Sequence, residues 1–120
     1  PGEGNMSVIV EKNKQQTIGI AYAQQVGVAK TTTVGVEQHN QVGKTKTAKV
    51  GKEYSVDVGE VMHIKAGKKM VLEVGKSKIE LHEDGTILFS GVDIKTQASG
   101  EVKTNAKKNV TIKGKKVLNN

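Results

Sequence analysis

Histidine is the residue type in this sequence best suited to bind a metal or move a proton near neutral pH. It occurs three times, as His39, His63 and His82, and cysteine does not occur at all. His39 and His63 both lie four residues before a glycine, 24 residues apart, but no carboxylate accompanies them. A zinc site needs three or four protein ligands around one ion. The sequence therefore predicts surface histidines and no metal site.

Carboxylates are the second candidate for chemistry, and four of them lie near one another: Glu80, Glu83, Asp84 and Asp93. Two carboxylates are what glycoside hydrolysis requires. However, strand edges and an Asp-Gly turn account for all four, and only 2% of the residues are aromatic and able to hold a sugar. No serine lies in a nucleophile elbow, and no glycine pattern opens a phosphate-binding helix. We predict a protein that is not an enzyme and has no cofactor.

The composition favours strands. The 120 residues include 17 valines, 10 threonines, 8 isoleucines and 14 glycines, and β-branched residues are enriched in strands. The net charge is +7, and all 19 basic residues are lysine. Arginine, which reads guanine and phosphate with two parallel hydrogen bonds, is absent. We interpret the lysines as a solvated outer surface and predict no nucleic-acid partner.

Glycine recurs at every eighth residue through the first two thirds of the chain. These predicted corner glycines are Gly19, Gly27, Gly35, Gly43, Gly51, Gly59, Gly67 and Gly75. Because eight is a multiple of two, every octad presents the same positions to the same face of a strand. Each octad is then one short strand and one corner, where glycine permits a positive φ or a close approach of two backbones.

The octad has an inward and an outward face. Positions two, four and six before the glycine are mostly polar and are predicted to face outward, whereas positions one and three face inward. The predicted core residues are Val8, Val10, Ile18, Val26, Val34, Val42, Val50, Val56, Val58, Ile64, Leu72 and Val74. Position three is polar in the early octads, at Gln16, Gln24, Thr32 and Asn40. These side chains either hydrogen-bond around a symmetry axis, which we favour, or hold ions or water.

One octad is too short to close a rung of a β-helix. A single chain with three octads per rung would give fewer than three rungs between Lys12 and Gly75, which is too few to cover a core. Three chains that each supply one side of every level give a tall prism with a narrow core. We therefore predict an all-β, intertwined homotrimeric triangular β-helix. Residues 1–11 form its degenerate edge, residues 12–76 the octad repeat, and residues 77–120 a continuing prism with longer rungs and an Asp84-Gly85 turn.

The tandem octads ending in Val-Gly, followed by Ser77 to Ile87, resemble the C-terminal needle of VgrG, the spike protein of bacterial type VI secretion. They are also similar to the related central spikes of contractile phage tails. Ile94, Gly100 with Val102, and the run Val110 to Gly114 match the later part of that needle. The resemblance implies a trimeric β-helical prism that is driven through the envelope of a target cell.

The resemblance also implies partners and a location. A PAAR-repeat protein would cap the narrow end and carry effectors, while hub domains outside this sequence would dock to the tube and baseplate. The protein would leave the bacterial cytoplasm through the type VI apparatus without a signal peptide and pass transiently through the target membrane. On the residues themselves, we expect the cap to meet the last apolar side chains, Val110, Ile112, Val117 and Leu118.

Two alternatives stay open. A phage or phage-like tail spike is of the same class, and the host and neighbours of the gene would distinguish it. A β-solenoid stalk that binds polyanions or glycans through lysine is of another class. Salt-sensitive binding to heparin or anionic lipid would favour that second alternative.

Overall fold

The structure is a computed structural model that describes residues 4–120. The chain divides into two units, Pro1–Lys52 (unit 1) and Glu53–Asn120 (unit 2). Within the described range there are three strands and no helix. The prediction of an all-β protein is therefore confirmed.

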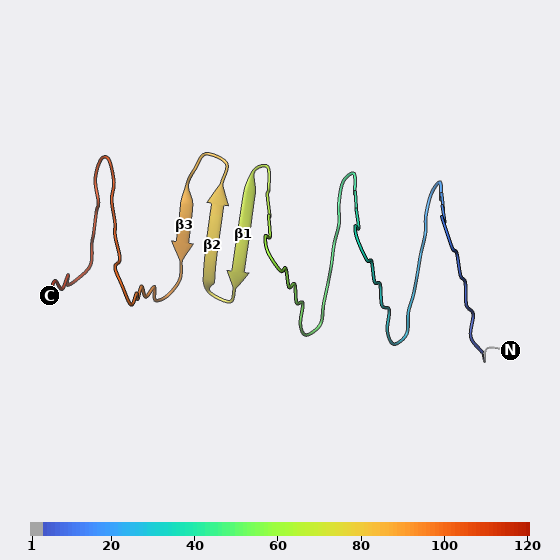
Figure 1. Ribbon diagram of the computed structural model, residues 1–120. Coiled ribbons are helices and arrows are strands. Elements are labelled where there is room, and N and C mark those ends of the chain that lie inside the picture. The colour runs from blue at the N-terminus through green and yellow to red at the C-terminus, as the bar shows by residue number, and fades with distance from the viewer. Residues whose placement is uncertain (1–3) are drawn as a thin grey trace. The chain divides into compact units, whose positions relative to one another are not determined.

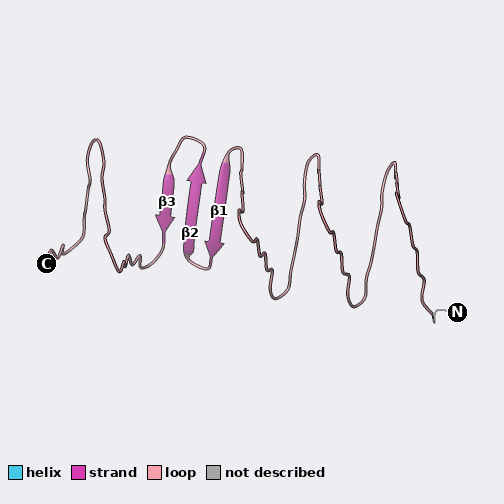
Figure 2. Ribbon diagram, in the orientation of Figure 1, coloured by secondary structure: helices cyan, strands magenta, loops and turns pink. Residues whose placement is uncertain are grey.

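Unit 1 consists of extended segments joined by regularly spaced bends. From residue 4 to residue 52 the bends lie at residues 11–12, 19–20, 27–28, 35–36, 43–44 and 51–52. Figure 1 shows this part, in blue to green, as a winding path, and Figure 2 shows no strand in it. No backbone–backbone hydrogen bond forms between any of these residues. Buried backbone donors and acceptors are nearly always paired in folded proteins, so a folded form of unit 1 requires other chains.

Unit 2 contains a three-stranded antiparallel sheet. Its strands are β1 (Lys69–Val74), β2 (Ser77–His82) and β3 (Ile87–Ser90), in the order β1-β2-β3. Leu72 pairs with Ile79 across β1 and β2, and Ile79 pairs with Phe89 across β2 and β3. The alternation of apolar and charged residues in β2 suits a sheet with one apolar face.

Two glycines with positive φ make the hairpin turns of this sheet. Gly75, between β1 and β2, has a φ of 53°, and Gly85, between β2 and β3, has a φ of 93°. The Gly85 amide donates to the His82 carbonyl at 3.1 Å, so the turn predicted at Asp84-Gly85 is present. Gly75 was predicted as one more corner of the octad repeat. It lies instead in a tight turn that reverses the chain, because the strands on either side of it pair with each other.

Regular bends resume after the sheet. They lie at residue 92 and at residues 99–100, 107–108 and 114–115. The segments between them are therefore about as long as an octad, which differs from the longer rungs expected for residues 77–120. A glycine is not needed at each bend, since Lys107 and Lys108 form one of them.

The two units have no interior of their own. None of the residues from 4 to 120 is buried, and the chain exposes 13947 Å². A compact monomer of 12.8 kDa would expose about 6,300 Å². No helix with the length and hydropathy needed to cross a membrane occurs in that same range.

Candidate functional site

The residues that precede the corner glycines lie on the more sheltered side of the bent chain. Val26 and Val34 are 45% and 46% exposed, whereas Val28 and Val36, which follow the same glycines, are both 100% exposed. All four are valines, so the backbone path and not the residue type causes the difference. The residues directly before Gly27 and Gly35 are thus about half covered by their own chain, whereas Val74, directly before Gly75, is 80% exposed. The uncovered surface of these residues is open to other chains.

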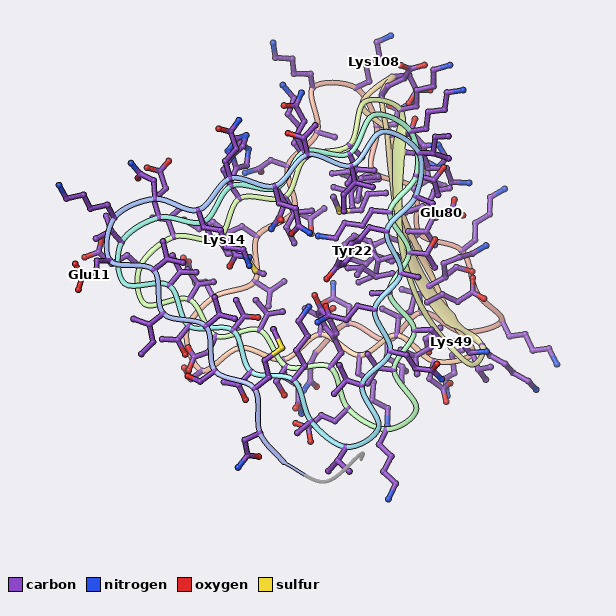
Figure 3. The ribbon with its side chains drawn as sticks, turned by 90° about the vertical axis from the view of Figure 1, so that its right-hand side faces the viewer. Glu11, Lys14, Tyr22, Lys49, Glu80 and Lys108 are labelled. Carbon is purple, nitrogen blue, oxygen red and sulfur yellow. The ribbon has the colours of Figure 1, made fainter. Side chains whose placement is uncertain are left out.

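A second inward position was missed in the sequence. Figure 3 shows Lys14 and Tyr22 pointing into the turns of unit 1, while Lys49 points outward. Lys14 and Tyr22 each lie five residues before a corner glycine. Lys30 occupies the same position in the next octad, and its Nζ donates to Oε1 of Gln24, an inward residue, at 2.8 Å. Alternation alone does not identify this position, because position seven has the same parity and its valines, Val28 and Val36, are fully exposed.

The fifth position adds polar side chains beside the inward valines of unit 1 and apolar side chains in unit 2. Along the chain this position holds Lys14, Tyr22, Lys30, Gln38, Lys46, Tyr54, Met62 and Met70. In unit 1 the inward lysines accompany the amides and hydroxyls at position three, whereas from Val56 onward both positions become apolar. The inward face therefore changes from a hydrated, hydrogen-bonding surface to one suited to dry packing.

One face of the β1–β3 sheet continues the apolar surface. The strand register places on it Met70, Leu72, Ile79, Leu81, Ile87 and Phe89. Leu72 and Phe89 remain 59% and 64% exposed. Removing such an apolar face from water is favourable. This face is therefore the strongest candidate in unit 2 for contact with other copies of the chain.

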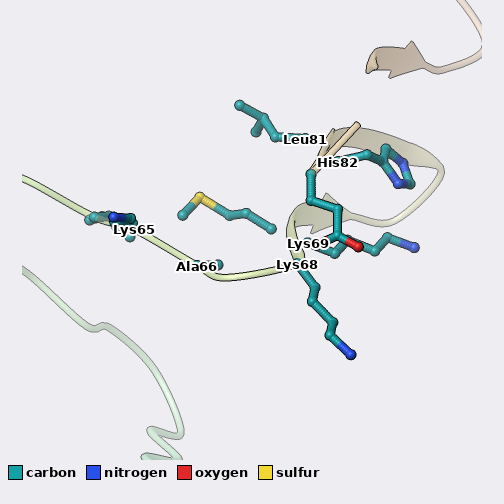
Figure 4. A pocket seen from close by; sticks show the side chains of 9 residues that line it. Lys65, Ala66, Lys68, Lys69, Leu81 and His82 are labelled. Carbon is teal, nitrogen blue, oxygen red and sulfur yellow. The ribbon is translucent and has the colours of Figure 1, made fainter. Parts of the chain in front are cut away.

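A hollow of about 250 Å³ lies where the chain enters the sheet. Figure 4 shows Ala66 and Leu81 among the side chains that line it. Its apolar lining also includes Ile64 and Met70, and lysines stand around it. Because the lining is largely apolar and open on one side, the hollow suits a side chain of a neighbouring copy better than a polar substrate.

The opposite face of the sheet carries a charged cluster around Glu80. Glu80 Oε1 lies 3.4 Å from Lys69 Nζ and 3.2 Å from Lys78 Nζ, and Glu80 Oε2 lies 3.0 Å from His82 Nε2. The hydrogen bonds from His82 and Lys78, together with the charge of Lys69, lower the pKa of Glu80 from 4.5 to about 2. Lys69 is on β1 and the other three residues are on β2, so this carboxylate joins the two strands.

Asp84 stabilises the second hairpin turn. Its Oδ1 accepts a hydrogen bond from the Thr86 amide at 2.9 Å, and this bond lowers the pKa of Asp84. Of the four neighbouring carboxylates, Glu80 therefore joins two strands and Asp84 holds a turn. In the part of the chain that the structure describes, no three His, Cys, Asp or Glu side chains form a group that could hold a metal ion.

The corner glycines are not required by their own chain. Among residues 4–120 only Gly4, Gly75 and Gly85 have a positive φ, so the left-handed conformation offered for the corners is wrong for Gly19 through Gly67. A Cβ atom at any of those seven corners would meet nothing of its own chain within 4 Å. Close approach by another chain is the explanation that stays open.

The predicted cap residues lie in unit 2, beyond the sheet. Val110, Ile112, Val117 and Leu118 are 52%, 70%, 59% and 81% exposed. They are apolar and uncovered, but no contact in the described residues assigns a partner to them.

The sequence of residues 2–81 matches a known protein family, that of the bacteriophage T4 gp5 C-terminal trimerisation domain. The match covers two thirds of the chain, including all the corner glycines, β1 and most of β2. None of the curated proteins compared with the chain matches it.

Proposed function

The chain belongs to the family of the bacteriophage T4 gp5 C-terminal trimerisation domain, and from this membership we propose that it is the shaft of a type VI secretion spike. The family supports a trimeric spike that is similar to phage tail spikes and to VgrG. In the proposed role, a contractile apparatus drives the trimer through the envelope of a target cell.

The observation that carries the proposal is the unpaired backbone of the repeat. From residue 4 to residue 67 the chain is extended, bends every eight residues and makes no backbone hydrogen bond with itself. Three such chains wound together would pair these groups between chains and leave few free strand edges. Separating the chains would then break many hydrogen bonds at once, which makes the trimer stiff along its length.

The outward side chains suit passage through a membrane. Most outward positions are polar and threonine is the most frequent residue there, as at Thr45 and Thr47, with lysine at Lys49. A charged and hydroxylated surface is not retained in hydrocarbon. Such a shaft crosses a bilayer only under external force and does not lodge there.

The proposal assigns no catalysis to this chain. It is a mechanical part that moves from the bacterial cytoplasm through the type VI apparatus without a signal peptide. A PAAR-type protein and an effector would sit on the open end of the prism, in contact with Val110, Ile112, Val117 and Leu118.

The secretory role is tested in the bacterium that makes the protein. Removing residues 12–76 from the gene should abolish killing of neighbouring prey cells and release of the protein into the medium of intact cells. Both should also disappear when the contractile sheath is removed. Recovery of the protein in phage-like particles from lysed cells, and not from intact cells, would instead support the phage tail spike.

The cap is tested by deleting residues 109–120 and measuring both trimer mass and capture of a cognate PAAR-type protein. A retained trimer with lost capture supports the assignment. Capture that survives the deletion would place the docking surface elsewhere on the shaft.

A further inference from the structure

Acidic residues are distributed very unevenly along the chain, although lysines are not. Residues 1–52 hold seven lysines and three acidic residues, residues 53–101 hold six and nine, and residues 102–120 hold six and none. The three segments therefore carry net charges of +4, −3 and +6, which together give the +7 of the chain. We call residues 102–120 the basic segment.

We infer that the basic segment binds the anionic headgroups of a lipid membrane. This inference rests on the proposed function, because it gives the spike a contact with the target envelope. The basic segment lies outside residues 2–81, which are the residues that the family match covers.

The lysines of the basic segment are free to meet a partner. Every residue from 102 to 120 is exposed. Within the described residues, one ion pair reaches this segment, between Lys103 Nζ and Glu101 Oε2 at 3.2 Å, and both side chains are more than 70% exposed. Lys107 and Lys108 form a bend, and Figure 3 shows Lys108 projecting away from the ribbon.

Trimerisation concentrates this charge. Six lysines in each chain become eighteen in the trimer, with no carboxylate between residues 102 and 120 to neutralise them. Like charges held at such density repel one another and attract anions. A surface that carries many negative charges relieves the repulsion at every lysine at once.

The types of residue favour lipid over nucleic acid or a protein. Arginine, whose planar fork recognises individual phosphates and carboxylates, is absent. No aromatic residue follows Phe89, so bases have nothing on which to stack. Lysine is a flexible point charge that demands no fixed geometry from its partner. A fluid layer of lipid phosphates matches that requirement, and a lysine near such a surface strengthens binding about fivefold.

The test measures binding of the trimer of the 120-residue chain to vesicles that contain equal amounts of phosphatidylcholine and phosphatidylglycerol. One variant carries Lys107→Gln, Lys108→Gln, Lys115→Gln and Lys116→Gln. The matched control carries Lys65→Gln, Lys68→Gln, Lys76→Gln and Lys95→Gln. These four changes remove the same charge from residues 53–101, and none of the four lysines takes part in an ion pair within the described residues. Co-sedimentation is measured at about 0.01 M and about 1 M salt, where the screening length falls from roughly 30 Å to roughly 3 Å.

We expect the unmodified trimer to bind these vesicles at low salt only and not to bind pure phosphatidylcholine. The first variant should lose at least about tenfold in affinity, and the control should stay within about twofold. Equal losses in both variants would overturn the inference and would favour the polyanion-binding stalk, whose lysines would bind along the whole chain. Equal binding to uncharged vesicles would also overturn it. So would tighter binding to a DNA duplex or to an acidic polypeptide than to the vesicles. The mass of each protein is measured first, so that a failure to form the trimer, which would contradict the proposed function, is not mistaken for a failure to bind lipid.

Discussion

Glu80 has a structural role in the sheet of unit 2. It accepts contacts from Lys69, Lys78 and His82, and it is the only side chain in the described range that brings two lysines and a histidine together. The cluster fixes β1 against β2 towards the end of the hairpin that is farther from the turn at Gly75. The chemistry of this site is therefore structural, and its titration should appear in stability.

Glu80→Gln should remove an acid-sensitive part of the stability. The pKa of Glu80 is lowered from 4.5 to about 2, so its ionised form is favoured in the folded state. That contribution is complete above about pH 4.5 and is lost as the pH falls towards 2. Across this pH range the melting temperature should fall more steeply for the unmodified protein than for Glu80→Gln. Glu73→Gln is the control, because Glu73 lies on β1 and on the same face of the sheet as Glu80, and this variant should keep the steep fall of the melting temperature. If Glu80→Gln showed the same pH dependence as the unmodified protein, the assignment would be contradicted.

At the scale of the element, each octad before β1 is an extended segment whose backbone has no partner in its own chain. The spacing of its bends could be predicted because glycine recurs every eight residues, and the bends of the backbone lie at those glycines. The hairpin at Gly75 could not be predicted from the repeat, since Val74-Gly75 reads like every other octad end. Pairing of β1 with β2 decides that turn, and pairing depends on residues beyond the repeat.

The same limit explains the missed inward lysines. Lys14 and Lys30 look like solvated surface residues by type, and only the path of the backbone turns them inward. The bends at residues 99–100 and 107–108 were missed for a related reason, because Ser99 and Lys107 carry no octad signature. The backbone thus continues to bend at regular intervals after the glycine repeat of the sequence has ended.

Val58→Asp tests the inward face of the element. Val58 precedes Gly59 and lies between the apolar inward residues Val56 and Ile64. In a trimer this change brings three carboxylates together in an apolar section, and an unpaired buried charge costs several kcal/mol. The variant should fail to assemble or should melt far lower. Thr47→Asp, on the outward face, should change little, and similar behaviour of the two variants in melting experiments would contradict the division into faces.

At the scale of the whole molecule, the large exposed area favours assembly, and the family of the trimerisation domain gives the number of chains as three. The chain exposes 13947 Å², more than twice the roughly 6,300 Å² of a compact monomer of its mass. Light scattering should therefore give three times 12.8 kDa, with a circular dichroism spectrum dominated by strands. A monomer at micromolar concentration would contradict both the trimer and the spike built from it.

Hydrogen exchange should separate pairing within a chain from pairing between chains. The amides of β1, β2 and β3 pair inside one chain, whereas those from residue 4 to residue 68 have no backbone partner there. In the trimer we expect the repeat amides to be strongly protected, because partner chains supply their acceptors and opening requires the strands to separate together. Val58→Asp, if it yields a soluble monomer, should expose the repeat amides at once while leaving some protection in the sheet. Fast exchange across residues 12–68 in a particle of trimer mass would show that the chains associate through the sheet alone, and would remove the continuous shaft from the proposed spike.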